Sequence, residues 1–199
     1  MLKMKSLFIS SYKEMKNVRS ITLIAMFGAI SIIFGMFLTV MLWDFLKVGF
    51  TFLPNEFVYY LFGPFVGIIY GGTLDILTYL VKPMGAFFPG FTISGILTGL
   101  LYGMLLYKRP LSLWRIVLVN ILRSVFIDLI LNTYWLTILN GEASVVMLPM
   151  RALKLFIMLP VESILLFAVI KGVEASGILK LLQSKSMKKS PASHSRSRL

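Results

Sequence analysis

Apolar segments follow one another from about residue 20 to residue 171 with few charges among them, and this pattern limits the chain to a membrane fold. A membrane-spanning helix needs roughly 20 predominantly apolar residues to cross about 30 Å of hydrocarbon. Apolar residues make up 58% of the chain and charged residues 14%, whereas soluble domains hold about 45–50% and about 25%. We therefore predict an all-α membrane protein with a single transmembrane domain over residues 20–171.

The apolar pattern predicts a bundle of six transmembrane helices, at about residues 20–42, 53–70, 71–81, 91–107, 112–139 and 146–171. Gly71-Gly72 is expected to separate the second helix from the third, because paired glycines interrupt a helix. The third helix then has about 11 residues and reaches only about 16 Å, which is too short to span. We expect the loop after it, residues 82–90, to re-enter the protein from the outer side, where a cavity or protein must surround it.

The basic residues predict that the N- and C-termini are both cytoplasmic. If the helices alternate in direction, the inner segments hold 15 Lys and Arg residues, and the outer loops hold only Lys47 and Lys82. Residues 1–19 are then a basic cytoplasmic segment, and residues 172–199 a basic, disordered tail attracted to anionic membrane lipid. Because the positive charges gather at helix ends and tails, the net charge of +12 reports topology, and we predict no nucleic acid partner.

The residue types that the chain lacks exclude several kinds of chemistry. There is no cysteine, and the one histidine, His194, lies in the tail. Disulfides and metal sites built on thiolate or imidazole are therefore excluded from the transmembrane domain. No G-x-x-x-x-G-K phosphate-binding loop occurs, so the chain is not expected to hydrolyse nucleotide itself. We predict no enzymatic activity, no metal and no cofactor.

Polar residues at one depth are the main functional signal. A charge at the middle of a spanning helix costs about 2.5–3.5 kcal/mol on insertion, so each one needs a reason. With the predicted orientation, polar residues from separate helices reach the outer half of the membrane: Asn55, Glu56, Asp75, Asn132, Arg151 and Lys154. We predict that they line one pocket that opens to the cell exterior.

The same residues can also be explained as structural ion pairs that hold the helices together. For Asp75, Asn132 and Arg151 we favour contact with a ligand, because they converge at the depth where the predicted re-entrant loop already implies a cavity. Both explanations stay open for four other residues in the spans: Arg123, Asp128, Lys154 and Glu162.

Many aromatic side chains lie near the depth of the predicted pocket. Most are expected to belong to the aromatic belt at the membrane interface. A few could stack on a flat ring, and the candidates are Tyr79, Phe88 and Trp135.

Small residues at four-residue spacing predict close contacts between helices. For the glycines at 63, 67 and 71 and at 95, 99 and 103 we expect packing within the bundle. The first helix carries Ala25 and Ala29 and has no ionisable residue between Arg19 and Asp44. We predict that this alanine pair contacts a separate membrane protein.

Several stretches resemble the folate-binding S-components of energy-coupling factor (ECF) vitamin transporters. They are "FLPNEF" at 52–57, "GGTLDILTYLVKP" at 71–83, "FFPGFTISGILTGLLYG" at 87–103, "NTYWL" at 132–136 and "LPMRALK" from 148. The resemblance extends over nearly all of residues 20–171. It implies a subunit of the bacterial plasma membrane that captures folate or a related pterin from outside. A transmembrane coupling protein and two ATP-hydrolysing subunits would then energise uptake.

The resemblance also implies roles for individual residues. Ala25 and Ala29 would dock the coupling protein, and two outer loops would gate the pocket through Trp43, Lys47, Pro83, Phe87 and Pro89. The carboxylate of Asp75 can accept two adjacent N–H donors from a pterin edge. Asn132 and Arg151 can donate to its carbonyl, and the glutamate tail would point toward Lys47 or Lys82.

Other functions stay open at this point. A membrane scaffold whose polar residues merely pair would have no affinity for small molecules. An intramembrane enzyme of lipid metabolism is disfavoured, because the spans hold no histidine and no metal-ligand cluster. A solitary secondary carrier would be expected to show an internal repeat, which the halves of this chain do not. Within transport, another vitamin or precursor is the strongest rival to folate.

Overall fold

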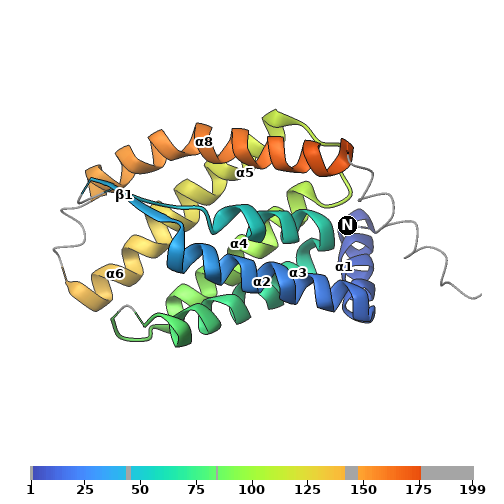
Figure 1. Cartoon of the computed structure of the whole chain (residues 1–199), viewed down its shortest axis with the longest axis horizontal. Helices are drawn as coiled ribbons and strands as arrows, with labels where there is room; N and C mark the ends of the chain where they lie inside the picture. The colour runs from blue at the N-terminus through green and yellow to red at the C-terminus, as the bar shows by residue number, and fades with distance from the viewer. Residues whose placement is uncertain (1, 44–45, 84, 142–147, 176–199) are drawn as a thin grey trace, which may run out of the picture.

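The structure is a computed structural model that describes residues 2–43, 46–83, 85–141 and 148–175. Helices dominate it, and one two-stranded hairpin lies between the second and third of them (Figure 1). The elements are α1 (Leu2–Met15), α2 (Val18–Phe37), β1 (Thr39–Trp43), β2 (Leu46–Gly49), α3 (Phe52–Val81), α4 (Pro89–Leu106), α5 (Leu113–Leu122), the π-helix η1 (Arg123–Leu131), α6 (Asn132–Asn140) and α8 (Leu148–Ala175).

Five helical stretches of the described chain are long and apolar enough to cross a membrane: α2, α3, α4, the continuous run from α5 to α6, and α8. Within α3 the backbone leaves helical geometry at Gly63, with φ 84° and ψ −170°. The chain reverses direction there, so that residues 52–62 lie beside residues 64–81. Tyr70, from the second half, donates a hydrogen bond to Asn55 in the first half (2.9 Å). Counted this way, the described residues after α1 form six helical segments, the number expected from hydropathy.

The boundary between the second and third segments differs from the prediction. Gly71-Gly72 was expected to break the helix, but the break falls at Gly63. Pro64 disfavours helical geometry at the residue before it, and glycine reaches a positive φ without strain. The short segment is therefore 52–62, and the predicted short third helix is wrong. Since 64–81 has about 18 residues and reaches about 27 Å, helix length no longer argues for a re-entrant loop after it.

Gly71 serves the packing of α3 against α4. A Cβ atom on Gly71 would lie 2.3 Å from the carbonyl oxygen of Gly95, and one on Gly67 would lie 2.4 Å from that of Gly99. Only glycine allows backbones to approach so closely. The predicted internal packing of these two glycine rows is thus present in the structure.

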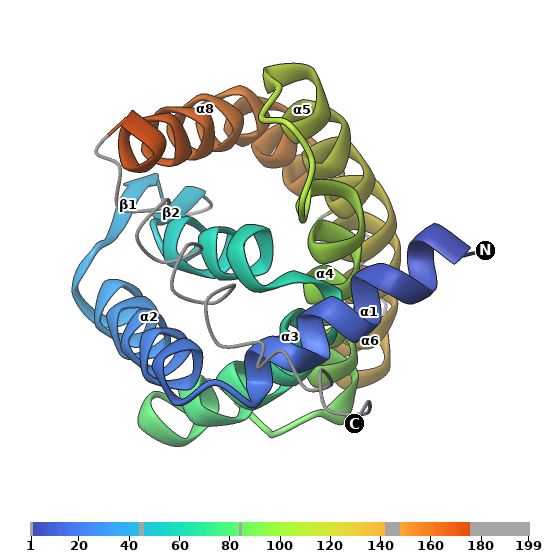
Figure 2. The same cartoon turned by 90° about the vertical axis from the view of Figure 1, so that its right-hand side faces the viewer.

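An N-terminal helix completes the broken end of α3. The Ser11 hydroxyl on α1 donates to the Phe62 carbonyl (2.6 Å) and accepts from the Val66 amide (3.1 Å). These backbone groups flank the Gly63 break and would otherwise lack partners. Residues 1–19 were predicted only as a basic segment, whereas α1 crosses the end of the bundle at the turn of α3 (Figure 2).

The connection between α2 and α3 was also predicted differently. The first helix was expected to continue to residue 42, but α2 ends at Phe37 and an antiparallel hairpin follows. Thr39 pairs with Gly49 and Val40 with Val48. The predicted all-α class holds for the bundle, and the hairpin is an addition in this one connection.

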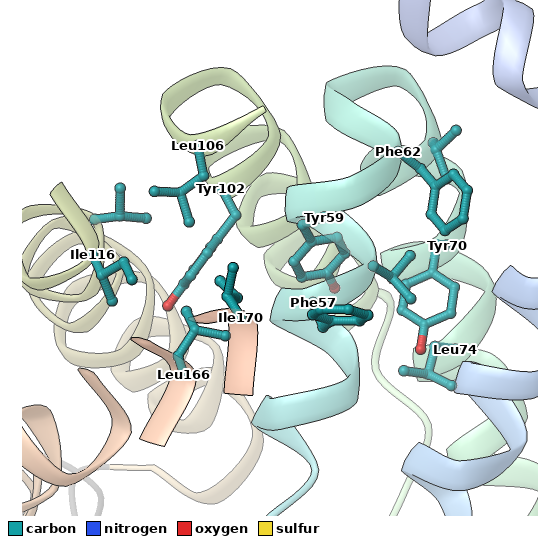
Figure 3. Close-up of a cluster of buried hydrophobic side chains, with 13 residues drawn as sticks. Phe57, Tyr59, Phe62, Tyr70, Leu74, Tyr102, Leu106, Ile116, Leu166 and Ile170 are labelled. Atoms are coloured by element: carbon teal, nitrogen blue, oxygen red, sulfur yellow. The ribbon is translucent and has the colours of Figure 1, made fainter. Parts of the chain in front are cut away.

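A buried apolar cluster holds the two halves of α3 to α4, α5 and α8. Figure 3 shows its side chains converging from these helices: Phe57, Tyr59, Phe62, Tyr70, Leu74, Tyr102, Leu106, Ile116, Leu166 and Ile170. Large apolar side chains also cover the outside of the bundle, and Phe156 on α8 is 80% exposed. An apolar exterior around a packed interior is what a lipid environment requires.

Candidate functional site

The bundle contains an open cavity of about 960 Å³ lined by α3, α4, η1, α6, α8 and the end of the hairpin. Its apolar lining includes Phe52, Tyr59, Phe91, Leu155 and Met158. Its polar lining consists of Asn55, Glu56, Asp75, Thr98, Arg123, Asp128, Asn132, Arg151, Lys154 and Glu162, together with Thr51. The lining is thus more polar than that of a typical small-molecule site, which is mostly apolar with a few convergent polar groups, and it suits a polar ligand.

Five of the eight substrate-binding residues predicted from the sequence line this cavity: Glu56, Asp75, Asn132, Arg151 and Lys154. Asp75 on α3 and Arg151 on α8 are far apart in the sequence, and both line this cavity. Their contact with a ligand stays a prediction.

The three predicted stacking residues do not belong to the lining. Trp135 packs against Phe88, with 5.6 Å between the ring centroids, and Phe88 packs against Phe91 at 6.1 Å. Tyr79 contacts Phe87 at 5.1 Å and donates to the Gly85 carbonyl (3.2 Å). In this structure these rings fasten the segment before α4, and the aromatic residues that reach the cavity are others, such as Phe91.

The predicted gating residues lie at the end of the bundle that holds the hairpin and the 82–88 turn (Figure 1). Pro83 and Phe87 are exposed in that turn, whereas Pro89 is already the first residue of α4. Trp43 and Lys47 lie in the two strands, and their side chains are outside the described part of the structure. Lys82 is exposed and does not line the cavity.

Arg123 holds three carboxylates together at the cavity wall. Its guanidinium lies 3.1 Å from Glu56, 2.9 Å from Asp128 and 3.4 Å from Glu162. The three acids come from α3, η1 and α8, so one cation ties three elements. Removal of one partner from a buried ion pair costs about 3–5 kcal/mol, because the remaining charge is left uncompensated.

The π-helix explains how Arg123 and Asp128 can act together. The i→i+5 hydrogen bonding of a π-helix brings residues five apart close to one face, whereas an α-helix would turn them apart. The Arg123 Nε therefore reaches Asp128 Oδ2 directly, and Asp128 Oδ1 accepts from Asn132 Nδ2 (3.3 Å). π-Helical segments are rare in proteins, and those that occur often lie at functional sites.

A second chain of hydrogen bonds supports the same network from behind. Tyr102 on α4 donates to Glu56 Oε1 at 2.7 Å and also contacts the amide oxygen of Asn120. The Asn120 amide nitrogen donates to Ser163 on α8 at 2.9 Å. Because Tyr102 and Arg123 both bind Oε1 of Glu56, the position of this carboxylate is closely defined.

Two acceptor atoms at the cavity wall remain without a donor in the described residues. They are Oε2 of Glu56 and Oδ1 of Asn132, and both are buried. A buried polar atom without a partner costs about 1–3 kcal/mol. The Asn132 Nδ2 donates one of its two hydrogens to Asp128, and its predicted donation to a ligand carbonyl stays a prediction; its Oδ1 adds an acceptor to the wall.

Asp75 is held less tightly than the acids around Arg123. Its Oδ2 accepts from the Thr92 hydroxyl on α4 (2.7 Å), and no cation lies within 4 Å of it in the described residues. Thr92 falls within a sequence stretch that carried the family resemblance, but its hydroxyl had no predicted role. Asn55 was expected at the depth of the pocket and lines the cavity, whereas Thr98 was missed, because a single polar residue in an apolar helix carries no periodic signal.

Ala25 and Ala29 are exposed on α2, on the side away from the bundle. Gly28, between them, faces inward, and a Cβ atom there would lie 3.4 Å from the Tyr70 ring. The alanine pair is therefore available to a neighbouring protein, and its role in docking stays a prediction.

Comparisons with known proteins agree with this architecture. A family model described as "ECF transporter, substrate-specific component" matches residues 19–183. The folate transporter FolT of Clostridium novyi (strain NT) is 33% identical over 165 residues, which cover 83% of this chain and 95% of that protein. The folate transporter FolT of Leuconostoc mesenteroides is 26% identical over 123 residues, which cover 59% and 66% of the two chains.

A solved structure is similar as well. The crystal structure of FolT bound with folic acid superposes with a TM-score of 0.68 at 31% sequence identity. The match covers 75% of this chain and 89% of that chain.

Proposed function

This chain belongs to the substrate-specific components of ECF transporters, and we propose that it is the folate-binding member of such a transporter. It is a substrate-binding transport component and not an enzyme. In this role it captures folate from outside the bacterial plasma membrane and delivers it through a shared energising module. Its relatives named as folate transporters, and a similar fold solved with folic acid, support folate over another vitamin.

The observation that carries the proposal is the shared cavity of Asp75, Asn132 and Arg151 inside a membrane bundle. Its volume of about 960 Å³ lies within the range of about 300–1,000 Å³ that is typical of small-molecule sites. The wall formed by α3 and the start of α6 offers hydrogen-bond acceptors, namely Asp75, Glu56 Oε2 and Asn132 Oδ1. A pterin edge presents an exocyclic amine and a ring N–H, which are donors that such acceptors can bind.

The partners follow from the family. A transmembrane coupling protein would bind the exposed face of α2 at Ala25 and Ala29, where small side chains allow close approach. Two ATP-hydrolysing subunits would supply the energy. The hairpin and the segment 82–88 would gate the cavity at its outer end.

The decisive experiment is calorimetric titration of folic acid into the purified protein. Tight binding to the wild type is expected, and Asp75→Asn should weaken it at least about tenfold, since one charge-assisted hydrogen bond contributes about 1.5–3 kcal/mol. Lys171→Gln, at the opposite end of α8 and outside the cavity, is the control for altered charge.

Unchanged affinity in Asp75→Asn would remove that residue from the site. Absence of folic acid binding to the wild type would remove folate as the ligand. In that case the mass of the small molecule that co-purifies with the protein would identify the vitamin actually bound.

A further inference from the structure

We propose that Arg151 and Lys154 form a clamp for the carboxylates of the ligand, so that folate lies with its glutamate tail against the first turns of α8. This inference rests on the proposed function and adds an orientation of the ligand in the cavity. It replaces the expectation from the sequence that the tail points to Lys47 or Lys82.

The two cations share one face of α8. Residues three and four apart are neighbours on a helix, and the inward face runs from Arg151 through Lys154, Leu155 and Met158 to Glu162. All five line the cavity. The opposite face carries exposed apolar side chains such as Phe156, so the two cations lie on the side that faces away from lipid.

Neither cation has an anionic partner in the described residues. The ion pairs found there all belong to Arg123, and no carboxylate lies within 4 Å of Arg151 or Lys154. The acids that influence Lys154 most are Glu162 and Asp128, and both already bind Arg123. Both cations are partly buried at membrane depth, where an unpaired charge is costly. An anionic group that enters the cavity would supply the missing partner.

The remainder of the cavity cannot fill this role. The rest of the lining carries one cation, Arg123, which is already bound by Glu56, Asp128 and Glu162. It also carries the carboxylate of Asp75 and the acceptor oxygen of Asn132, so acids outnumber cations there by four to one. Dicarboxylate groups would be repelled there, whereas the N–H donors of a ring would be attracted. The cavity is therefore polarised toward the first turns of α8. A ligand with a donor-rich ring at one end and carboxylates at the other fits it in one direction only.

The position of the clamp strengthens its attraction for anions. Arg151 lies in the first turn of α8, and Lys154 lies in the next turn. The N-terminal end of a helix carries a partial positive charge that adds to the field of the two side chains. Arg151 can also bind a carboxylate with two parallel hydrogen bonds, which fixes its direction.

The test compares folic acid with pteroic acid, which has the same ring system but lacks the glutamate. Kd is measured for both ligands with the wild type, with Arg151→Gln, Lys154→Gln and the double variant, and with Lys171→Gln as control. Lys171 is on the same helix, and it lies outside the cavity.

We expect the wild type to prefer folic acid over pteroic acid by at least about tenfold. The double variant should lower this preference to within about threefold, through weaker binding of folic acid alone, and Lys171→Gln should keep it. If Arg151→Gln fails to fold, Lys154→Gln alone must still lower the preference at least about threefold.

Equal affinity of the wild type for both ligands would overturn the clamp and leave folate binding intact. A preference that persists in the double variant, or an equal loss for both ligands, would overturn it as well. If the wild type binds neither ligand, the proposed function itself falls.

Discussion

Replacement of Gly99 by alanine tests the contact that positions two walls of the cavity. A Cβ atom at this position would lie 2.1 Å from the carbonyl oxygen of Gly67 and 2.4 Å from its carbonyl carbon. Both are backbone atoms, so no side chain can move aside. Contacts of this kind start near 3.0 Å, so α3 and α4 would have to separate by about 1 Å.

The structure gives a magnitude for Gly99→Ala. Overpacking of a well-packed interior costs about 1–3 kcal/mol, and a clash between two backbones belongs at the upper end, about 2–3 kcal/mol. In chains of this size 1 kcal/mol shifts Tm by about 2–4 °C, so a decrease of about 4–12 °C is expected. Folic acid binding should weaken too, since α4 contributes Phe91 and Thr98 to the lining.

The assay is thermal unfolding in detergent, followed by tryptophan fluorescence. Gly172→Ala is the matched control, because a Cβ atom on Gly172 meets nothing within 4 Å. There alanine should stabilise the helix by up to about 1 kcal/mol. If the Tm of Gly99→Ala falls by less than about 2 °C relative to wild type, α3 and α4 do not approach as described.

Two further variants test other parts of the fold. Ser11→Ala leaves two buried backbone groups at the α3 break without partners and should cost at least about 2 kcal/mol of unfolding free energy. Lys5→Ala, at an exposed position on the same helix, should cost below about 0.5 kcal/mol; similar losses for the two would mean that α1 does not close the break. Ala25→Leu and Ala29→Leu should preserve folic acid binding and abolish uptake by vesicles that contain the energising module, while Phe156→Leu, exposed on α8, should preserve both. Uptake that survives both alanine substitutions would remove α2 as the docking face.

Hydropathy predicted the number of helical segments because the exclusion of polar backbone from lipid acts along the sequence. Whether a segment is long and apolar enough to span the membrane can be read from its own residues, without knowing which helices pack against it. Hydropathy could not choose between Gly63 and Gly71 as the point of reversal. The proline of Gly63-Pro64 is a local signal for a helix break. Gly71 instead allows close packing against α4, and that contact can be recognised only once the fold is known.

The N-terminal helix and the hairpin escaped prediction for a related reason. The segment 2–15 is too polar overall for hydropathy to mark it, because lysines and serines are mixed with its apolar residues, and contacts such as that of Ser11 with the broken end of α3 stabilise it. The apolar residues 39–43 continue the hydropathy of α2 without interruption. Only the pairing of Thr39 with Gly49 and of its neighbours turns them into a strand.

The predicted polar residues line one cavity because exposure of a charged side chain to lipid is costly, so such side chains face the interior of the bundle. The stacking residues failed to reach it, since interfacial aromatic side chains have many alternatives, and Trp135 finds one in Phe88. The π-helix could not be predicted, because its residues Arg123–Leu131 have an ordinary apolar pattern. Its effect is to align Arg123 with Asp128, which a regular helix would not do.

The geometry separates the intramembrane charges into two groups with different physical roles. Arg123 contacts three carboxylates from three elements, so the fold itself compensates these charges and would lose stability without them. Arg151 and Lys154 stand outside that network, and no described acid compensates them. A protein that merely paired its charges would have no reason to keep two cations apart from the acids that share their cavity. Their separation is what binding of an anionic ligand requires.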